Sequence, residues 1–216
     1  MYGTVDDDWV VRYYDEAFTS QGVADLPWIV GKVRQTGGPI LDLACGAGRI
    51  ALRLAQIGYE VTGLDRSGGM LSRFRDKLAR EPAEVRARVR LAQAAMPAFA
   101  LARQFKTIIC CDAFFHNLSV ADQLSCLGCV VRCLAPGGRF LFNLPNPTCE
   151  FILKSTGSER GTFTERGRYP LADGGLLRLE QALDGDIVEG DKNVFLPPPQ
   201  ASALHQLPAP KLRSGP

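Results

Sequence analysis

The sequence predicts an α/β fold: a Rossmann-like, mainly parallel twisted sheet with helices on both faces. From about residue 37 to residue 145, short apolar runs alternate with amphipathic stretches, which is the pattern of successive βαβ units. The first apolar run leads into a Gly-rich turn that opens a helix, and the second run ends on an acidic residue, Asp65. In open parallel sheets these two features lie at the carboxyl ends of neighbouring strands and bind nucleotide-like cofactors.

The expected elements follow one another in a regular order. Five segments are apolar and bounded by Gly, Pro or charge, so we predict strands at residues 39–44, 60–64, 89–92, 107–111 and 139–143. Amphipathic stretches predict helices at residues 8–17, 26–35, 48–57, 67–79 and 121–134. The first two helices precede the sheet and are expected to cap the mouth of the site. Residues 162–169 and 176–183 predict an added antiparallel strand pair.

Length and composition predict one catalytic domain. With 216 residues, of which 46% are hydrophobic, the chain can bury a sizeable core, and we assign residues 1–195 to one domain. Residues 196–216 hold six prolines and little apolar periodicity, so this tail is predicted to be disordered.

Charge and hydropathy argue against several classes of partner. The formal net charge is +2, from 25 basic and 23 acidic residues spread along the chain, so no strongly charged face for nucleic acid is expected. No apolar stretch approaches the roughly 20 residues that span a bilayer, and the first residues are acidic without an apolar signal region. We therefore expect a cytoplasmic protein without a membrane partner. The sequence makes no prediction of oligomeric state.

Three cysteines, Cys126, Cys129 and Cys133, form a pattern that could hold zinc or an iron–sulfur cluster. Their spacing is also that of one apolar face of the helix predicted at residues 121–134, which explains them without a metal. We predict buried, reduced thiols and no metal site.

The Gly-rich turn is the strongest single feature. Gly46 and Gly48 permit a tight turn and the close approach of a ligand, while the helix that follows presents free N–H groups. Asp65 follows Asp42 by 23 residues and can accept hydrogen bonds from both hydroxyls of a ribose. Two alternatives need no ligand: a tight βα connection, and a strand-end acid that caps the next helix.

The turn also satisfies the spacing of an NAD-dependent dehydrogenase, because Gly46-x-Gly48-x-x-Ala51 matches G-x-G-x-x-A. Asp42 argues against this alternative. It lies inside the strand immediately before the turn, where a dehydrogenase strand is usually apolar.

Further motifs follow the turn in a fixed order over roughly residues 26–147. In sequence they are Leu41-Asp-Leu-Ala-Cys-Gly-Ala-Gly-Arg49, Gly58-Tyr-Glu-Val-Thr-Gly-Leu-Asp-Arg-Ser-Gly-Gly-Met-Leu71, Met96, Phe114-Phe-His116 and Leu134-Ala-Pro-Gly-Gly-Arg-Phe140. In these motifs the chain resembles class I S-adenosylmethionine-dependent methyltransferases of the small-molecule type. The resemblance implies S-adenosylmethionine as cofactor, with the turn at its amino-acid end, Asp65 on the ribose, and Met70 and Met96 beside the adenine. The cofactor-binding residues that it implies are Tyr14, Asp42, Ala44, Gly46, Gly48, Arg49, Asp65, Arg66, Met70, Ala95, Met96 and Cys111.

The chain departs from the family pattern in three places. Ala44 replaces the first glycine of the turn. Ala95 stands where the family usually places an acid for the adenine amino group, and an amino group left buried and unpaired would weaken binding by about 1–3 kcal/mol. After residue 190 too few apolar residues remain for the last two strands of the family sheet, so we expect a truncated or altered C-terminus and an exposed sheet edge.

Methyl transfer from an activated sulfonium chiefly requires a positioned nucleophile and exclusion of water. His116, after the fourth strand, is the candidate catalytic base; alternatively it packs on the cofactor or caps the next helix. Phe114, Phe115 and Tyr14 are candidates for an apolar acceptor pocket or for the core, and Asn143 is expected only to shape a loop. We predict an enzyme that methylates a small-molecule O, N or C nucleophile. The alternative is a catalytically impaired relative that retains at most cofactor binding.

Overall fold

The computed structural model describes Val11, Tyr14 and Asp15, the continuous segment 25–144, and five strands that follow it. The chain divides into two compact units, residues 2–145 and residues 146–216 together with Met1. The sequence predicts one domain up to residue 195, so that predicted boundary falls inside the second unit.

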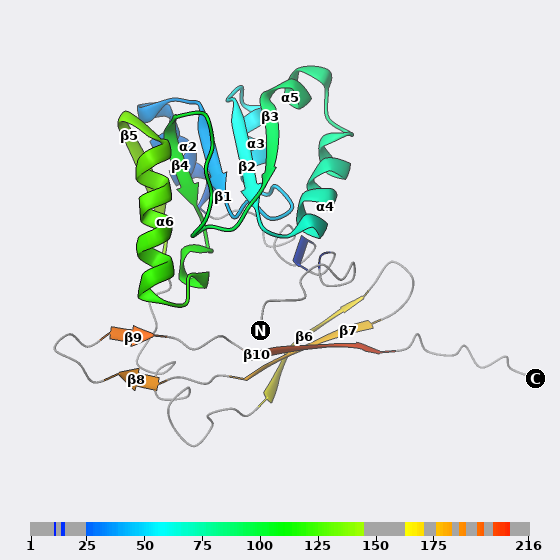
Figure 1. Ribbon diagram of the computed structural model, residues 1–216. Coiled ribbons are helices and arrows are strands. Elements are labelled where there is room, and N and C mark those ends of the chain that lie inside the picture. Colours follow the sequence, from blue (N-terminus) through cyan, green and yellow to red (C-terminus); the bar gives the residue numbers. More distant parts are fainter. Residues whose placement is uncertain are drawn as a thin grey trace, which may run out of the picture. The chain divides into compact units, whose positions relative to one another are not determined.

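The first unit contains a five-stranded sheet with the strand order β3-β2-β1-β4-β5 (Figure 1). Its strands are β1 (Ile40–Leu43), β2 (Val61–Asp65), β3 (Val89–Gln93), β4 (Phe105–Cys110) and β5 (Leu134–Phe142). Every neighbouring pair runs parallel, which confirms the predicted Rossmann-like sheet. The order of the strands reverses between β1 and β4, and open α/β sheets bind their ligands in the crevice at the carboxyl ends of such strands.

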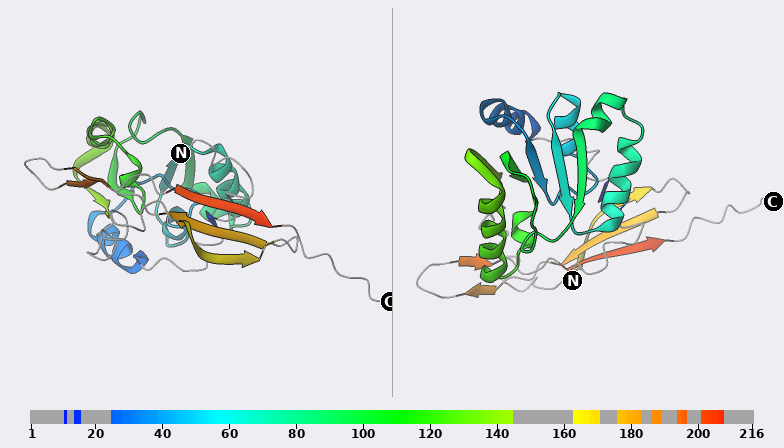
Figure 2. Two further views of the ribbon diagram at one scale, coloured as in Figure 1. Left: turned by 90° about the horizontal axis from the view of Figure 1, so that it is seen from below. Right: turned by 45° about the horizontal axis from the view of Figure 1, so that its top comes forward.

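Helices cover both faces of this sheet (Figure 2). Ile40 belongs to an apolar cluster with four helices, while Leu41 and Leu43 belong to a second cluster with α6. Because neighbouring residues of a strand point to opposite faces, the two clusters lie on opposite sides of the sheet. The helices are α2 (Leu26–Thr36), α3 (Ala51–Gln56), α4 (Gly68–Leu78), α5 (Ala83–Arg88) and α6 (Val120–Cys133), with a short 3₁₀ helix η1 (Phe114–His116).

Most predicted elements are confirmed to within about two residues, and three differences have local causes. Helix α3 begins at Ala51 instead of residue 48, because Gly46 and Gly48 have positive φ and hold the chain outside a helix. Strand β5 begins at Leu134 instead of residue 139 and pairs with β4 across a register shift. The short helix α5 has too few turns to give a clear apolar periodicity, and the sequence analysis missed it. Of the helix predicted at residues 8–17, only Val11, Tyr14 and Asp15 lie within the described residues, and all three are helical.

The three cysteines of α6 are part of the core. Cys126, Cys129 and Cys133 are 0%, 2% and 3% exposed and belong to the apolar cluster on that face of the sheet. Their predicted burial on one helix face is confirmed. The absence of a bound metal stays a prediction.

Strand β5 is an edge strand of the sheet in the described residues, and the loss of the last two family strands stays a prediction. Phe142 and Leu144, at the end of β5 and just after it, are exposed. Among the residues that the structure describes, no helix combines the length and the apolar character needed to cross a membrane.

The second unit contains two small antiparallel sheets. Strands β6 (Phe163–Pro170) and β7 (Leu176–Ala182) form the predicted pair, and β10 (Ala201–Leu207) adds to the other edge of β7. Strands β8 (Asp186–Val188) and β9 (Val194–Leu196) pair with each other. Strand β10 lies within residues 196–216, the tail that the sequence predicts to be disordered. Its seven residues lack proline, although prolines flank them at 199 and 208, so they can form a full ladder with β7.

Candidate functional site

The turn after β1 departs from ordinary backbone geometry at several positions. Ala44, Gly46 and Gly48 have φ of +61°, +53° and +81°. A Cβ at Gly48 would lie 2.5 Å from the ring of Phe74, whereas nothing lies within 4 Å of the corresponding position at Gly46. Gly48 therefore lets helix α4 pack against the turn, and Gly46 leaves open space beside it.

The side chain of Asp42 contacts the start of the helix that follows the turn. Its side chain is buried, and its Oδ2 accepts the backbone N–H of Ala51, the first residue of α3, at 3.1 Å. Burial raises the pKa of Asp42 to about 7, against the lowering effects of the Ala51 N–H and the Arg49 charge. This carboxyl group fixes the start of the helix and does not face solvent.

Asp65 joins the turn to the end of β2. Its Oδ2 accepts the N–H of Gly46 at 2.8 Å, and its Oδ1 accepts the N–H of Ser67 at 2.9 Å. The Ser67 hydroxyl in turn caps α4 by accepting the N–H of Met70 at 3.1 Å. A carboxylate has about four lone-pair sites, so Asp65 can accept further hydrogen bonds from a ligand.

The amino-terminal segment contacts the same turn. Val11 and Tyr14 pack with Ala47 of the turn and with Met70 of α4. The position of Tyr14 beside the turn agrees with the predicted cap over the mouth of the site.

The buried carboxylate of Asp15 connects the amino-terminal segment to α4. Asp15 accepts hydrogen bonds from Arg73 Nε at 2.8 Å and from Lys77, both on α4. Lys77 also donates to the carbonyl oxygen of Ala47 at 3.2 Å, so one ammonium group connects the segment, the helix and the turn.

Met96, which follows β3, packs in a different apolar cluster from Met70. Met96 packs into the α6 side of the core, and its Sδ lies 3.8 Å from Asn117 Nδ2 and 3.8 Å from Cys110 Sγ. Ala95 is partly exposed and presents only a methyl group. The expected positions of Met70, Ala95 and Met96 around an adenine stay predictions.

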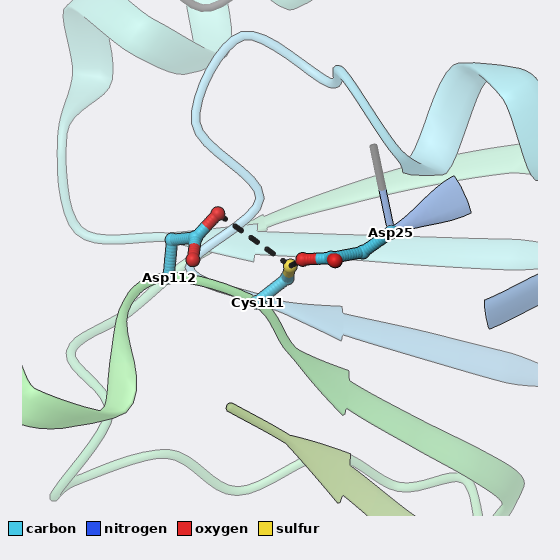
Figure 3. Close-up of side chains that lie close together, drawn as sticks. All are labelled: Asp25, Cys111 and Asp112. Carbon is cyan, nitrogen blue, oxygen red and sulfur yellow. Dashed lines mark hydrogen bonds between the residues drawn. The ribbon is translucent and has the colours of Figure 1, made fainter. Parts of the chain in front are cut away.

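The residues after β4 bring three ligand-type side chains together (Figure 3). Cys111 Sγ lies 3.8 Å from Asp25 Oδ2 and 3.7 Å from Asp112 Oδ2. Burial and the nearby Asp112 charge raise the pKa of Cys111 to about 12, so its thiol stays protonated and can donate to a carboxylate. In the described segments this is the single group whose atoms lie close enough to share a metal ion, but the guanidinium of Arg49 already contacts Asp112.

Asp112 and Asn143 form a contact that the sequence analysis missed. Asp112 has φ of +53°, and its N–H donates to Asn143 Oδ1 at 2.6 Å. Asn143 Nδ2 donates back to Asp112 Oδ1 at 2.5 Å, and Arg49 Nη2 donates to Asp112 Oδ2 at 3.1 Å. Asn143 was expected only to shape a loop. The available signal was a polar residue within two residues of the end of each of two neighbouring strands.

His116 ends the η1 helix and is exposed. Partial desolvation and the positive charge of Arg66 lower its pKa below the usual 6.5, while Asp65 acts in the opposite direction. The imidazole is therefore neutral at pH 7 and able to accept a proton. Its electrostatic coupling to Arg66 and Asp65 places it at the same end of the sheet as the predicted cofactor residues.

The aromatic residues of η1 divide between the core and the site. Phe114 is buried and packs its ring 6.2 Å from Phe140 and 5.0 Å from Phe142, between ring centroids. It belongs to the core cluster on the α6 side of the sheet. Phe115 lies with its ring 4.4 Å from the ring of His116, so it remains a candidate for such a pocket.

Comparisons with known proteins agree on one family. A family model described as a methyltransferase domain matches residues 40–138. YqeM of Bacillus subtilis (strain 168), whose name assigns it to the methyltransferases, is 36% identical over 118 residues, which are 54% of this chain and 46% of that protein. The ubiquinone biosynthesis O-methyltransferase of Stutzerimonas stutzeri (strain A1501) is 31% identical over 55% of this chain and 49% of its own length. The chain thus spans about half the length of the curated relatives it matches.

Solved structures support the same family. The glycopeptide N-methyltransferase MtfA, in complex with S-adenosylmethionine, is 28% identical with a TM-score of 0.56, covering 88% of this chain and 78% of that one. An S-adenosylmethionine-dependent methyltransferase from Clostridium acetobutylicum ATCC 824 is 20% identical with a TM-score of 0.60, covering 94% and 81%, which shows the fold alone.

The strand order, the Gly-rich turn and the acid at the end of β2 define an α/β domain built to hold a nucleoside-type cofactor at its switch point. Residues 40–138 of this domain match the model of a methyltransferase domain, and the chain is similar to a methyltransferase solved with S-adenosylmethionine.

Proposed function

We propose that the chain is a methyltransferase that moves the methyl group of S-adenosylmethionine to an O, N or C nucleophile of a small molecule. The observation that carries the proposal is the 2.8 Å hydrogen bond from Gly46 N–H to Asp65, which joins the two cofactor motifs of β1 and β2 at the switch point. The names of the relatives support a small acceptor, because they include a ubiquinone biosynthesis O-methyltransferase and a glycopeptide N-methyltransferase.

The residues present fit the proposed cofactor. The open space at Gly46 leaves room for a ligand against the backbone, and the spare lone pairs of Asp65 suit the hydroxyls of a ribose. Ala44, Gly48, Arg49 and Arg66 belong to the same turn and strand ends. When bound, S-adenosylmethionine supplies a methyl group on a positively charged sulfur, which already makes it reactive.

The protein would then contribute position and a proton acceptor. His116 is neutral at pH 7 because of its lowered pKa, so its imidazole can take a proton from a hydroxyl or ammonium acceptor. Desolvation and the charge of Arg66 keep it neutral, and Asp65 would stabilise the imidazolium after proton transfer. The cap residues Val11 and Tyr14 pack on the turn and would help to exclude water.

Calorimetric titration with S-adenosylmethionine, S-adenosylhomocysteine and NAD tests cofactor choice. We expect both adenosyl ligands to bind and NAD not to bind, and binding of NAD alone would contradict the proposed cofactor. Transfer of labelled methyl from S-adenosylmethionine to a panel of phenols, amines and activated carbon acids then tests the acceptor class, with transfer RNA and duplex DNA as comparison acceptors.

A second candidate function is cofactor binding without catalysis. Two observations favour it: β5 ends the described sheet, and Ala95 offers no carboxylate to an adenine. Binding of S-adenosylhomocysteine with no transfer to any acceptor in the panel would support this alternative.

A further inference from the structure

Two residues other than glycine adopt the left-handed backbone conformation in the described part of the chain, and both lie at the switch point. Ala44 follows β1 with φ of +61°, and Asp112 closely follows β4 with φ of +53°. Strands β1 and β4 are direct neighbours. The left-handed conformation costs about 1–2 kcal/mol in a residue with a side chain, so it persists where the surroundings hold it, and such residues cluster at ligand sites.

Asn143 holds Asp112 in this conformation. One amide group contacts both the main chain and the side chain of Asp112, because Oδ1 accepts its N–H at 2.6 Å and Nδ2 donates to its carboxylate at 2.5 Å. Since β4 and β5 are paired, these two bonds tie together the carboxyl ends of neighbouring strands.

The other carboxylate oxygen of Asp112 contacts the Gly-rich turn. Arg49, which directly follows Gly48, donates to it at 3.1 Å. The two side chains are 22% and 48% exposed, and a partly exposed ion pair contributes at most about 1 kcal/mol to folding. A contact that requires a left-handed backbone and adds little stability is better explained by its effect on the Gly-rich turn that carries Arg49.

We propose that Asn143 and Asp112 are positioning residues that brace the Gly-rich turn through Arg49, so that the crevice between β1 and β4 is formed before the cofactor enters. The proposal rests on the proposed function, since it concerns the same cofactor site. A preformed site has less conformational freedom to lose on binding and therefore binds more tightly. Without Asn143, Asp112 relaxes to a right-handed backbone, its carboxylate leaves Arg49, and the turn loses its contact with β4.

Titration of the full chain with S-adenosylhomocysteine at pH 8 tests whether Asn143 and Asp112 position the Gly-rich turn. Asn143→Ala should bind about tenfold more weakly than wild type, because it loses two hydrogen bonds to one strained residue. The matched control is Gln35→Ala. Gln35 accepts a hydrogen bond from Arg139 at 3.4 Å near the amino end of the sheet, so its loss removes an amide contact to the same strand β5 far from the crevice and should leave the affinity unchanged.

Asn143→Asp separates a positioning role from a purely structural one through its pH dependence. This variant keeps an acceptor for the Asp112 N–H, but it places two carboxylates against each other. They repel at pH 8 and share a proton at low pH. Relative to wild type at the same pH, its affinity should recover several-fold between pH 8 and pH 5.5, whereas the affinity of Asn143→Ala should not. Melting temperatures of all variants record any loss of folding.

Asp112→Gly provides a second variant that does not depend on Asn143. Glycine adopts the left-handed backbone without strain, so the chain at residue 112 keeps its conformation while the carboxylate is lost. We expect the same tenfold weakening of S-adenosylhomocysteine binding. Wild-type affinity in Asn143→Ala or in Asp112→Gly, or parallel pH profiles for Asn143→Ala and Asn143→Asp, would overturn the proposal. Failure of the wild-type chain to bind S-adenosylhomocysteine would instead contradict the proposed function.

Discussion

The two halves of the parallel sheet build their parts of the site with different contacts. At the ends of β1 and β2, Asp42 and Asp65 accept backbone N–H groups of the turn and of the following helices. At the ends of β4 and β5, Asp112 and Asn143 bond mainly through side chains and remain at least partly exposed. The first half is fixed by main-chain geometry, which suits a constant cofactor. The second half depends on side chains, which connect the ends of β4 and β5 to the same turn through Arg49.

The largest effect should come from the backbone-determined half, at Gly48. A Cβ there would lie 2.5 Å from the ring of Phe74, which is fully buried, and φ is +81°. Gly48→Ala should therefore lower the free energy of unfolding by about 2–5 kcal/mol through overpacking and left-handed strain. Urea denaturation measures this loss. Gly46→Ala is the matched control, because φ is also positive but nothing lies within 4 Å, and it should cost only about 1 kcal/mol. Equal losses would contradict the packing explanation.

The second largest effect should come from the side-chain half, at His116. If the His116 imidazole takes a proton from the molecule that is methylated, His116→Gln should lower kcat about 100-fold. The affinity for S-adenosylhomocysteine should stay unchanged. Steady-state kinetics with an acceptor from the panel measures both quantities. His205→Gln changes the other histidine of the chain, in β10, and serves as the control.

The pH profile of the same reaction tests the cause of the lowered pKa. Activity should fall as pH drops through the pKa of His116, which lies below 6.5, because the protonated ring cannot act as a base. Arg66→Gln removes a charge that lowers this pKa, so the acidic limb of the profile should move to higher pH. An unchanged limb would argue that His116 is not the titrating group.

Asp65 is the residue of the backbone-determined half that we propose to contact the ribose of the cofactor. Asp65→Ala should weaken binding of S-adenosylhomocysteine by about 1.5–3 kcal/mol, the range for hydrogen bonds to a charged group. Asp76→Ala removes the same charge from an exposed position of α4 and should leave binding unchanged. Similar losses in both variants would show that only net charge matters.

The sequence predicts the first half of the site better than the second for the same physical reason. A turn with positive φ and no room for a Cβ requires glycine, as at Gly48, so the constraint is visible as a motif. The contact between Asp112 and Asn143 requires only two polar residues after neighbouring strands, and many residue types occupy such positions. The left-handed conformation of Asp112 is likewise invisible, because aspartate is also common in ordinary turns.

The elements of the fold also differ in how well the sequence predicts them. The parallel sheet and its longer helices follow from apolar periodicity over many residues. The sequence analysis missed strand β10 because its alternation of apolar and polar residues covers only residues 201–207 between prolines. Its stabilising partner β7 is about 20 residues away in the chain. Short elements that depend on a distant partner carry little local signal.

The last prediction concerns the pH dependence of folding and Asp42, the buried acid in β1 directly before the turn. Its pKa is raised to about 7 in the folded protein, above the ordinary value of 3.8, so the folded state holds a proton that the unfolded state releases. This contribution to stability is complete below about pH 4 and is lost as pH rises toward 7, at roughly 1.4 kcal/mol for each pH unit. Asp42→Asn is neutral at every pH and can still accept the Ala51 N–H, so its unfolding free energy, measured by urea denaturation without cofactor, should vary less between pH 5 and pH 8 than that of wild type. Asp76→Asn, an exposed control, should follow the wild-type profile. A wild-type profile in Asp42→Asn would mean that this carboxyl group is ionised in the folded protein, with Arg49 and the Ala51 N–H outweighing its burial.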